Sequence, residues 1–245
     1  MFVHGFNYSF PESLYRLAEM AGDSELDGVP ILFAWPSEAS LSGYLADKEA
    51  VTYSRDGLSD VLAMLAGEGS VGRITLLGHS MGAWLTVEAL RQLRLTGRDG
   101  VIDRLDVILA APDIDVDVFR SQMAVVGPLS PPLKVLVSRD DVALAVSSRL
   151  AGARPKVGAL DVDDPRVLAV ALREKIQIID ISALASSDRL NHDRFISLAT
   201  LSPSLSPAGA ASGDLRNAGA FVFNTVGKTL SSPFTLVGRA LAGEQ

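Results

Sequence analysis

The chain of 245 residues contains no cysteine, so disulfide bonds, thiolate metal ligands and a cysteine nucleophile are all excluded. It contains only three histidines, His4, His79 and His192. These are too few for a histidine-rich metal site, and we expect neither a metal nor a cofactor. Any reaction that needs an imidazole must use one of these three residues.

Long apolar runs and basic clusters are missing as well. No run of about 18 apolar residues occurs, so no segment is expected to span a bilayer. The formal net charge is −7, and no cluster of lysines and arginines is long enough to follow a phosphate backbone. We therefore expect no nucleic-acid partner.

The first residues, "MFVHGFN", already lie within a strand-like run, with no signal peptide before them. We expect either that upstream sequence is missing, together with any targeting signal, or that the earlier strands of the sheet were never present. The compartment cannot be read from such a chain, and the cytoplasm is only the default expectation.

Short apolar runs alternate with helical patterns, which is typical of βαβ units and a mostly parallel, doubly wound sheet. The runs are rich in Val, Ile and Leu, as expected for strands that are buried on both faces. The predicted strands are residues 1–4, 30–35, 73–77, 105–110, 133–138 and 175–181. The predicted helices are residues 11–21, 49–66, 83–95 and 141–150. The fold class is therefore α/β, with one domain over residues 1–201.

The composition changes near residue 201. The stretch "SPSLSPAGAASGD" predicts a linker over residues 202–216, and apolar residues return at helical spacing in the tail, residues 217–245. Two interpretations of this amphipathic tail remain open. It packs on the domain, which we expect, or it contacts a membrane surface or a partner, including a second copy of the chain.

Residues 74–82, "ITLLGHSMG", place a serine between two glycines at the end of a strand-like run. Gly78, Ser80 and Gly82 fit the G-x-S-x-G pattern of a sharp strand-to-helix turn, in which larger side chains at the glycine positions would collide with neighbouring elements. The turn raises the serine hydroxyl above the sheet at a helix N-terminus, where the Met81 amide can face an oxyanion. The pattern predicts that Ser80 is a nucleophile.

A serine nucleophile needs a base within hydrogen-bond reach and an acid that orients the base. His79 is adjacent to Ser80, but its side chain must point elsewhere at a sharp turn, and we interpret it as structural. His192 follows the last predicted strand, from where a loop can place an imidazole over the turn. We therefore predict that His192 is the base.

Two groups of aspartates compete for the role of the acid. Asp140 and Asp141 end the fifth predicted strand, and Asp113 follows the fourth. In this strand order the acid usually lies after the strand two beyond that of the nucleophile, which favours the pair. Adjacent side chains cannot both point at one imidazole. We favour Asp141 over Asp140, with Asp113 as the remaining alternative.

The segment "FVHGFN" places His-Gly-Phe after a strand, in the manner of a loop that supplies a second oxyanion amide, here the Phe6 N–H. Gly5 allows the backbone to approach closely, and His4 is expected to hold the loop by hydrogen bonding. Three aromatic residues are expected either to line an acyl pocket or to pack in the core: Trp35, Tyr44 and Phe119.

Together these segments resemble the α/β-hydrolase superfamily, and in more detail a poorly characterised bacterial family of esterase- and lipase-like hydrolases. The matching segments are "VHGFN", "FAWPS", "LLGHSMGAWL", "LAAPDIDVDVF", "VSRDDVAL" and "NHDRF", together with Tyr44 and Asp47. The combination of "WPS", "APDID" and S-x-x-D-x-A-L is the more specific part, and it assigns the acid to Asp141.

The resemblance implies a Ser80–Asp141–His192 triad and carboxylic-ester hydrolysis, which we expect to act on a small-molecule ester through an acyl-enzyme. The chain departs from the family in one respect, since the strands expected before "FVHGFN" are absent. Two alternatives remain. The same triad could serve an acyltransferase or a thioesterase, or the chain could be an inactive hydrolase fold that binds a partner through its tail.

Overall fold

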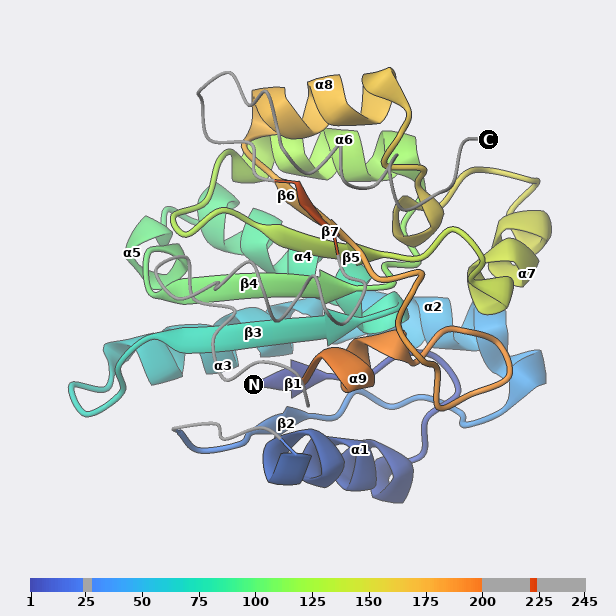
Figure 1. Ribbon diagram of the computed structural model, residues 1–245. Helices are drawn as coiled ribbons and strands as arrows, with labels where there is room; N and C mark the ends of the chain where they lie inside the picture. The colour runs from blue at the N-terminus through green and yellow to red at the C-terminus, as the bar shows by residue number, and fades with distance from the viewer. Residues whose placement is uncertain (24–27, 200–220, 224–245) are drawn as a thin grey trace, which may run out of the picture.

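The computed structural model describes residues 1–23, 28–199 and 221–223, which form one sheet between two layers of helices (Figure 1). The sheet has the order β2-β1-β3-β4-β5-β6-β7, and all pairs are parallel except β6 with β7. The strands are β1 (Phe2–Val3), β2 (Leu32–Phe33), β3 (Ile74–His79), β4 (Leu105–Ala110), β5 (Lys134–Val137), β6 (Gln177–Asp180) and β7 (Phe221–Phe223). All six predicted strands are present, which confirms the α/β fold class.

The helices that connect the strands are more numerous than the apolar spacing predicted. They are α1 (Phe10–Asp23), α2 (Tyr44–Tyr53), α3 (Arg55–Gly67), α4 (Met81–Leu95), α5 (Asp99–Ile102), α6 (Val116–Val126), α7 (Val142–Leu150), α8 (Pro165–Glu174) and α9 (Arg194–Ala199), with 3-10 turns η1 (Leu41–Gly43) and η2 (Val157–Ala159). The helix predicted over residues 49–66 is two helices, α2 and α3. They meet at Ser54, whose hydroxyl donates to the Ala50 carbonyl at 2.8 Å.

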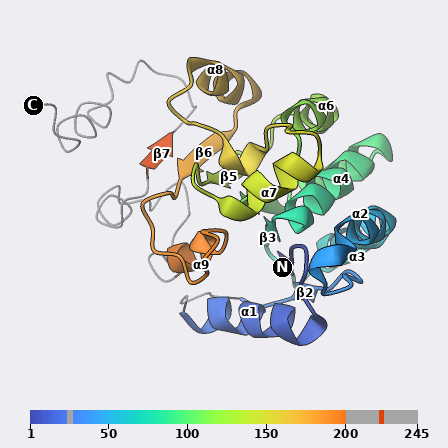
Figure 2. The same cartoon turned by 90° about the vertical axis from the view of Figure 1, so that its right-hand side faces the viewer.

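The two faces of the sheet carry layers of different size (Figure 2). Helices α2, α3, α4, α6 and α8 cover one face, and α1 and α9 cover the other. The larger buried cluster lies under the first layer and includes Leu62, Leu90 and Leu109. The smaller cluster joins Ile108 of β4 to Met20 of α1 and Phe195 of α9. Successive β4 residues therefore enter different cores, as the twofold repeat of a doubly covered strand requires.

The C-terminal segment differs from its predicted helical form where it is described. Residues Phe221–Phe223 form β7, which pairs antiparallel with β6 and places Phe223 opposite Ile178. Backbone pairing with the free side of β6 takes precedence here over the helical spacing of apolar residues. The linker, residues 202–216, and the rest of the tail lie outside the described residues.

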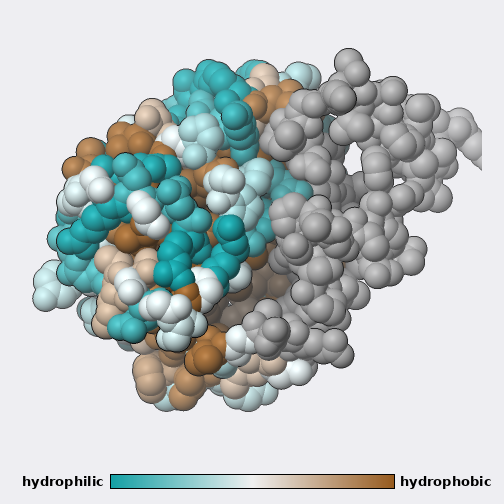
Figure 3. Space-filling model, turned by 90° about the vertical axis from the view of Figure 1, so that its left-hand side faces the viewer, coloured by the Kyte–Doolittle hydropathy of each residue, from teal (hydrophilic) through white to brown (hydrophobic). Residues whose placement is uncertain are grey.

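The parallel strands bring the loops after β1, β3, β4, β5 and β6 to one edge of the sheet, which faces the viewer in Figure 2. Open α/β sheets bind ligands at this carboxyl edge. Figure 3 shows the opposite side, where hydrophilic and hydrophobic residues are interspersed. Among the described residues, no helix combines the length and the hydrophobicity that crossing a membrane requires.

Candidate active site

Ser80 lies on the turn between β3 and α4 with φ of 54° and ψ of −117°, a conformation that is rare for a residue with a side chain. The predicted reason for the two flanking glycines holds. A Cβ on Gly78 would lie 2.4 Å from Thr86 Oγ1, and a Cβ on Gly82 would lie 2.2 Å from the carbonyl oxygen of His4. Only glycine lets α4 pack this closely against β1 and β3.

The strained turn is held by backbone hydrogen bonds to its neighbours. The Ser80 N–H donates to the Ala110 carbonyl at 2.9 Å, and the Ser80 carbonyl accepts from Ala83 N at 3.1 Å and from Asp113 N at 3.2 Å. The residue is 5% exposed. Strand β4 and its following loop therefore fix the serine in position.

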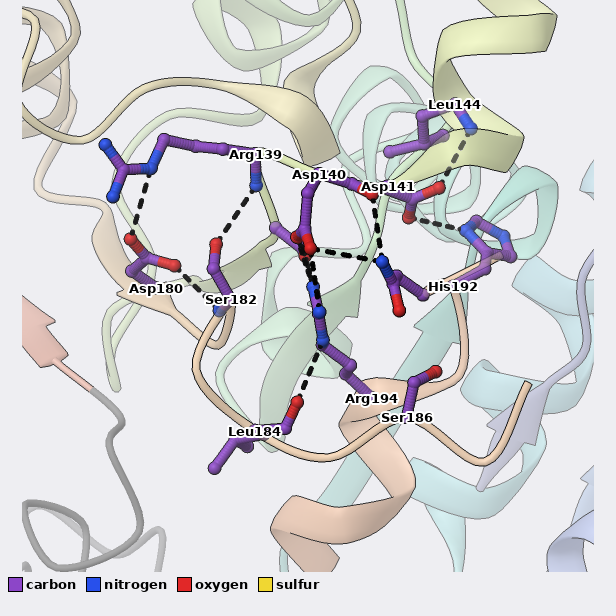
Figure 4. A network of polar contacts seen from close by, with 12 residues as sticks. Arg139, Asp140, Asp141, Leu144, Asp180, Ser182, Leu184, Ser186, His192 and Arg194 are labelled. Carbon is purple, nitrogen blue, oxygen red and sulfur yellow. Dashed lines mark hydrogen bonds and ion pairs between the residues drawn. The ribbon is translucent and has the colours of Figure 1, made fainter. Parts of the chain in front are cut away.

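Asp141 and His192 come together across two loops, as Figure 4 shows. Asp141 is the N-cap of α7, where one carboxylate oxygen accepts from Leu144 N at 2.9 Å. The other oxygen lies 2.7 Å from His192 Nδ1, and the Asp141 side chain is fully buried. An ionised carboxylate only accepts hydrogen bonds, so Nδ1 is the donor and Nε2 of the neutral ring is left as an acceptor.

The environment of His192 favours a more basic imidazole. Burial lowers its pKa, but the hydrogen bond and the charge of Asp141 outweigh burial, and the net pKa is raised above its usual value. The His192 N–H donates to Asp188 Oδ1 at 3.0 Å, which fixes the loop that carries the ring. Asp188 was not among the predicted site residues, because a loop contact of this kind leaves no pattern in the sequence.

Ser80 and His192 line the same cleft at the carboxyl edge of the sheet, with a volume of about 910 Å³. Within the described ranges, no hydrogen bond joins the Ser80 hydroxyl to the His192 ring. Catalytic hydrogen bonds in ligand-free enzymes are commonly long and tighten when substrate binds. The cleft therefore brings together the predicted nucleophile and the predicted base.

Asp140 points away from His192 and makes a separate ion pair (Figure 4). It accepts from Arg194, from Ser138 Oγ at 2.9 Å and from Asn191 Nδ2 at 3.1 Å. The hydrogen bond from Arg194 is the main reason that the pKa of Asp140 falls to about 2. The two adjacent aspartates thus diverge, and Asp140 fastens the β5 loop to the loop of His192.

Asp113 is bonded to three side chains, none of which is His192. It accepts from Tyr44 Oη at 2.9 Å, from Ser147 Oγ at 3.0 Å and from Lys156 Nζ at 2.7 Å. Burial alone would raise the pKa of Asp113, but the charge of Lys156 and the hydrogen bonds from Lys156 and Tyr44 together outweigh burial and lower it. This pair could not be predicted from the sequence, because Lys156 lies 43 positions after Asp113 and no local pattern joins them. In the fold Lys156 is 3% exposed. Asp113 ties α2 to α7 at the base of the cleft.

His79 packs behind His192. Its ring centroid lies 4.6 Å from that of His192 and 4.4 Å from that of Phe195. The side chain is 1% exposed, and neither ring nitrogen has a hydrogen-bond partner among the described residues. Burial holds the pKa of His79 well below its usual value, so the ring is neutral. A neutral, buried ring with no bond to Ser80 agrees with the structural role that we expected.

The loop after β1 lies beside Ser80, where a Cβ on Gly5 would be 3.0 Å from the Ser80 Cβ. The His4 ring stacks on Trp35 at 4.8 Å, and its nitrogens lie 2.9 Å from the Gly5 carbonyl and 3.1 Å from the Trp35 carbonyl. The Trp35 indole N–H donates back to the His4 carbonyl at 2.8 Å. The Phe6 N–H has no acceptor within the described part of the chain, so a ligand can accept from it.

The "WPS" segment is joined to this loop by Asp47, whose side chain is buried. Asp47 accepts from Ser37 Oγ at 2.6 Å, from Glu38 N at 2.7 Å and from Asn7 N at 3.5 Å. Asp47 therefore joins the loop after β1 to the "WPS" segment and to α2, and these contacts together support the Phe6 amide. Of the three aromatic residues considered for an acyl pocket, Tyr44 lines the cleft, whereas Trp35 and Phe119 belong to the buried core.

The described residues contain no cluster of three or more His, Asp or Glu side chains that could hold a metal ion. The polar groups at the carboxyl edge are instead arranged in pairs and hydrogen-bonded networks. The strand order of the sheet, the strained turn at Ser80 and the cleft at the carboxyl edge together are those of an α/β hydrolase.

More particularly, the chain matches the family described as alpha/beta hydrolase of unknown function (DUF900) over residues 1–208, and it belongs to that family. No curated protein and no solved structure matches the chain. The family assignment confirms the resemblance drawn from the sequence motifs, and it leaves the substrate open.

The glycine after the serine can be tested directly. We expect Gly82→Ala to lower the free energy of unfolding by about 3 kcal/mol or more, because the new methyl group would press on backbone atoms of His4 and Val3 that cannot rotate away. Urea denaturation measures the loss. The matched control is Gly72→Ala, since a Cβ at Gly72 meets nothing within 4 Å. Equal stability of the two variants would contradict the close packing of α4 on β1.

Proposed function

We propose that the protein is a serine hydrolase that cleaves carboxylic esters through an acyl-enzyme. Ser80 is the nucleophile, His192 the general base and Asp141 the acid that orients His192. The observation that carries the proposal is the 2.7 Å contact between Asp141 and His192 in the cleft that the strained Ser80 also lines. The other two aspartates considered for this role are each engaged elsewhere, which supports the choice of Asp141.

In the first half of the reaction, the Ser80 oxygen attacks the ester carbonyl while His192 Nε2 takes its proton. The imidazolium is stabilised by Asp141, which stays ionised. The tetrahedral oxyanion accepts hydrogen bonds from the N–H groups of Phe6 and Met81, of which the second lies at the N-terminus of α4. His192 then gives its proton to the departing alkoxide, which leaves as an alcohol.

In the second half, water replaces the alcohol. His192 takes a proton from the water, the hydroxide adds to the acyl carbonyl, and the carboxylic acid leaves as His192 returns the proton to Ser80. If another alcohol or a thiol replaces water at this step, the same residues transfer the acyl group. Ester hydrolysis is the simplest reaction that the residues support, because it needs no second substrate other than water.

The nucleophile is tested with a fluorophosphonate probe and intact-mass spectrometry. We expect one covalent adduct per chain in the wild type and none in Ser80→Ala, with loss of nearly all p-nitrophenyl ester hydrolysis in the variant. The variant must retain the wild-type circular dichroism spectrum. A folded wild-type protein that is not labelled would refute the enzyme and favour an inactive hydrolase fold that binds a partner.

The orienting acid is tested by a matched pair of neighbours. We expect Asp141→Asn to lower kcat by about 10⁴-fold, because the amide would hold the wrong tautomer of His192. Asp140→Asn is the control, since Asp140 contacts Arg194 and not the imidazole. Its kcat should stay within tenfold of the wild type. A larger loss in Asp140→Asn than in Asp141→Asn would reverse the assignment.

The pH dependence follows from the state of His192. The base accepts a proton only when neutral, so kcat/KM should rise with pH through the pKa of His192 and then level off. Because Asp141 raises this pKa, the midpoint should lie above the ordinary histidine value of about 6.5. Initial rates between pH 5 and 9 at fixed ionic strength measure it. A midpoint below that value, with two different leaving groups, would exclude His192 as the base.

A further inference from the structure

The cleft has two arms of different chemistry on either side of Ser80. The first, here called the α2–α7 arm, has Leu41, Val146 and Leu150 at its rim and Tyr44, Asp113 and Ser147 at its base. The second, called the α1 arm, is bordered by Glu12 and Arg16 of α1 and by Asp188 and Asp193 of the His192 loop. Figure 2 shows α7 and α2 on one side of the carboxyl edge and α1 on the other.

The α2–α7 arm offers a ligand no free charge. Its one ionised group, Asp113, is neutralised by Lys156 at 2.7 Å and accepts from both Tyr44 and Ser147. Lys156 is 3% exposed, so a ligand in the cleft cannot contact its ammonium group. The hydrogen bonds close the base of the arm, and only apolar side chains remain above it to contact a ligand.

The apolar side chains at the rim of the α2–α7 arm are largely exposed to solvent. Leu41 is 78% exposed, Val146 48% and Leu150 67%. Large apolar side chains gathered at a cleft are typical of ligand-binding grooves. An acyl chain lying between α2 and α7 would remove water from these three side chains and from itself.

The position of His192 decides whether the acyl group or the alcohol of an ester enters the α2–α7 arm. His192 must reach the oxygen of the leaving alcohol to protonate it, so the alcohol lies on the side of His192, toward the α1 arm. That arm keeps uncompensated charge, because Glu12 and Asp188 make no ion pair within the described residues, whereas Arg16 is paired with Asp193 at 2.6 Å. Tyr15 of α1 also lines it. The carbonyl oxygen faces the Phe6 N–H, and the acyl group extends in the remaining direction, past the Tyr44 ring that packs edge-on against Phe6 at 5.3 Å.

We propose that the substrate is an ester of a straight, apolar acyl chain longer than acetyl, which binds in the α2–α7 arm, with Val146 as a specificity-determining residue. This inference rests on the proposed function of Ser80 and names the substrate class of that site. A fully buried CH₂ group strengthens binding by about fourfold. At a half-exposed rim the gain is roughly twofold per CH₂, so six further CH₂ groups should raise kcat/KM roughly 60-fold.

The test is a series of p-nitrophenyl esters with one leaving group, from acetate through butyrate to octanoate, below the concentration at which they form micelles. We expect kcat/KM to rise along the series by roughly 60-fold in the wild type. We expect Val146→Glu to lower kcat/KM for octanoate by about tenfold and for acetate by less than twofold, since the carboxylate stands in the arm that only the longer chain fills.

The matched control is Val118→Glu on α6, which exchanges the same residue type at a similar exposure of 41% and lies outside the cleft. It should leave the whole series unchanged. A flat or falling series in the wild type, or an equal loss of acetate and octanoate hydrolysis in Val146→Glu, would overturn the substrate class. If acetate is hydrolysed and Ser80 is labelled, the proposed function stands in either case. Absence of both labelling and hydrolysis would overturn the two proposals together.

Discussion

The backbone of Ser80 is the constraint on which the rest of the site depends. Its positive φ is possible only because α4 can lie directly against β1 and β3, and that approach requires glycine two positions before and after the serine. The same turn places the Ser80 hydroxyl both at the N-terminus of α4 and at the carboxyl edge of the sheet. The loops of β1, β4, β5 and β6 are then arranged around a fixed point.

These loops are held by polar contacts that lie behind the residues to which we assign the reaction. His4, Trp35 and Asp47 support the loop of the Phe6 amide, and Arg194 with Asp140 fastens the β5 loop to the loop of His192. Asp113 and Lys156 close the base of the α2–α7 arm. Such supports are buried or paired, and their side chains are therefore unavailable to act on a substrate. The apolar side chains at the rim of the α2–α7 arm therefore remain available to contact a substrate.

Much of this arrangement could be predicted from sequence, because the strongest signals are local. Six strands follow from apolar runs, and the serine turn follows from glycine spacing. The divergence of Asp140 and Asp141 could be anticipated only by a steric argument. That argument already favoured Asp141, and the resemblance to a family then assigned the acid to it. Helices α5, α6, α8 and α9 were not predicted. Lys156 and Asp188 were missed because each is bonded to a residue that lies elsewhere in the sequence or makes a loop contact without a pattern. The strand formed by residues 221–223 depends on a pairing with β6 that no local pattern records.

The central claim is that Ser80 carries the acyl group during turnover. Acid quenching within the first turnover on p-nitrophenyl butyrate, followed by peptide mass spectrometry, measures this directly. The account predicts a butyryl group on the peptide that contains Ser80, formed in step with a burst of p-nitrophenol of one equivalent per chain. Steady release of p-nitrophenol with no acylated peptide, or a butyryl group on a different residue, would contradict it.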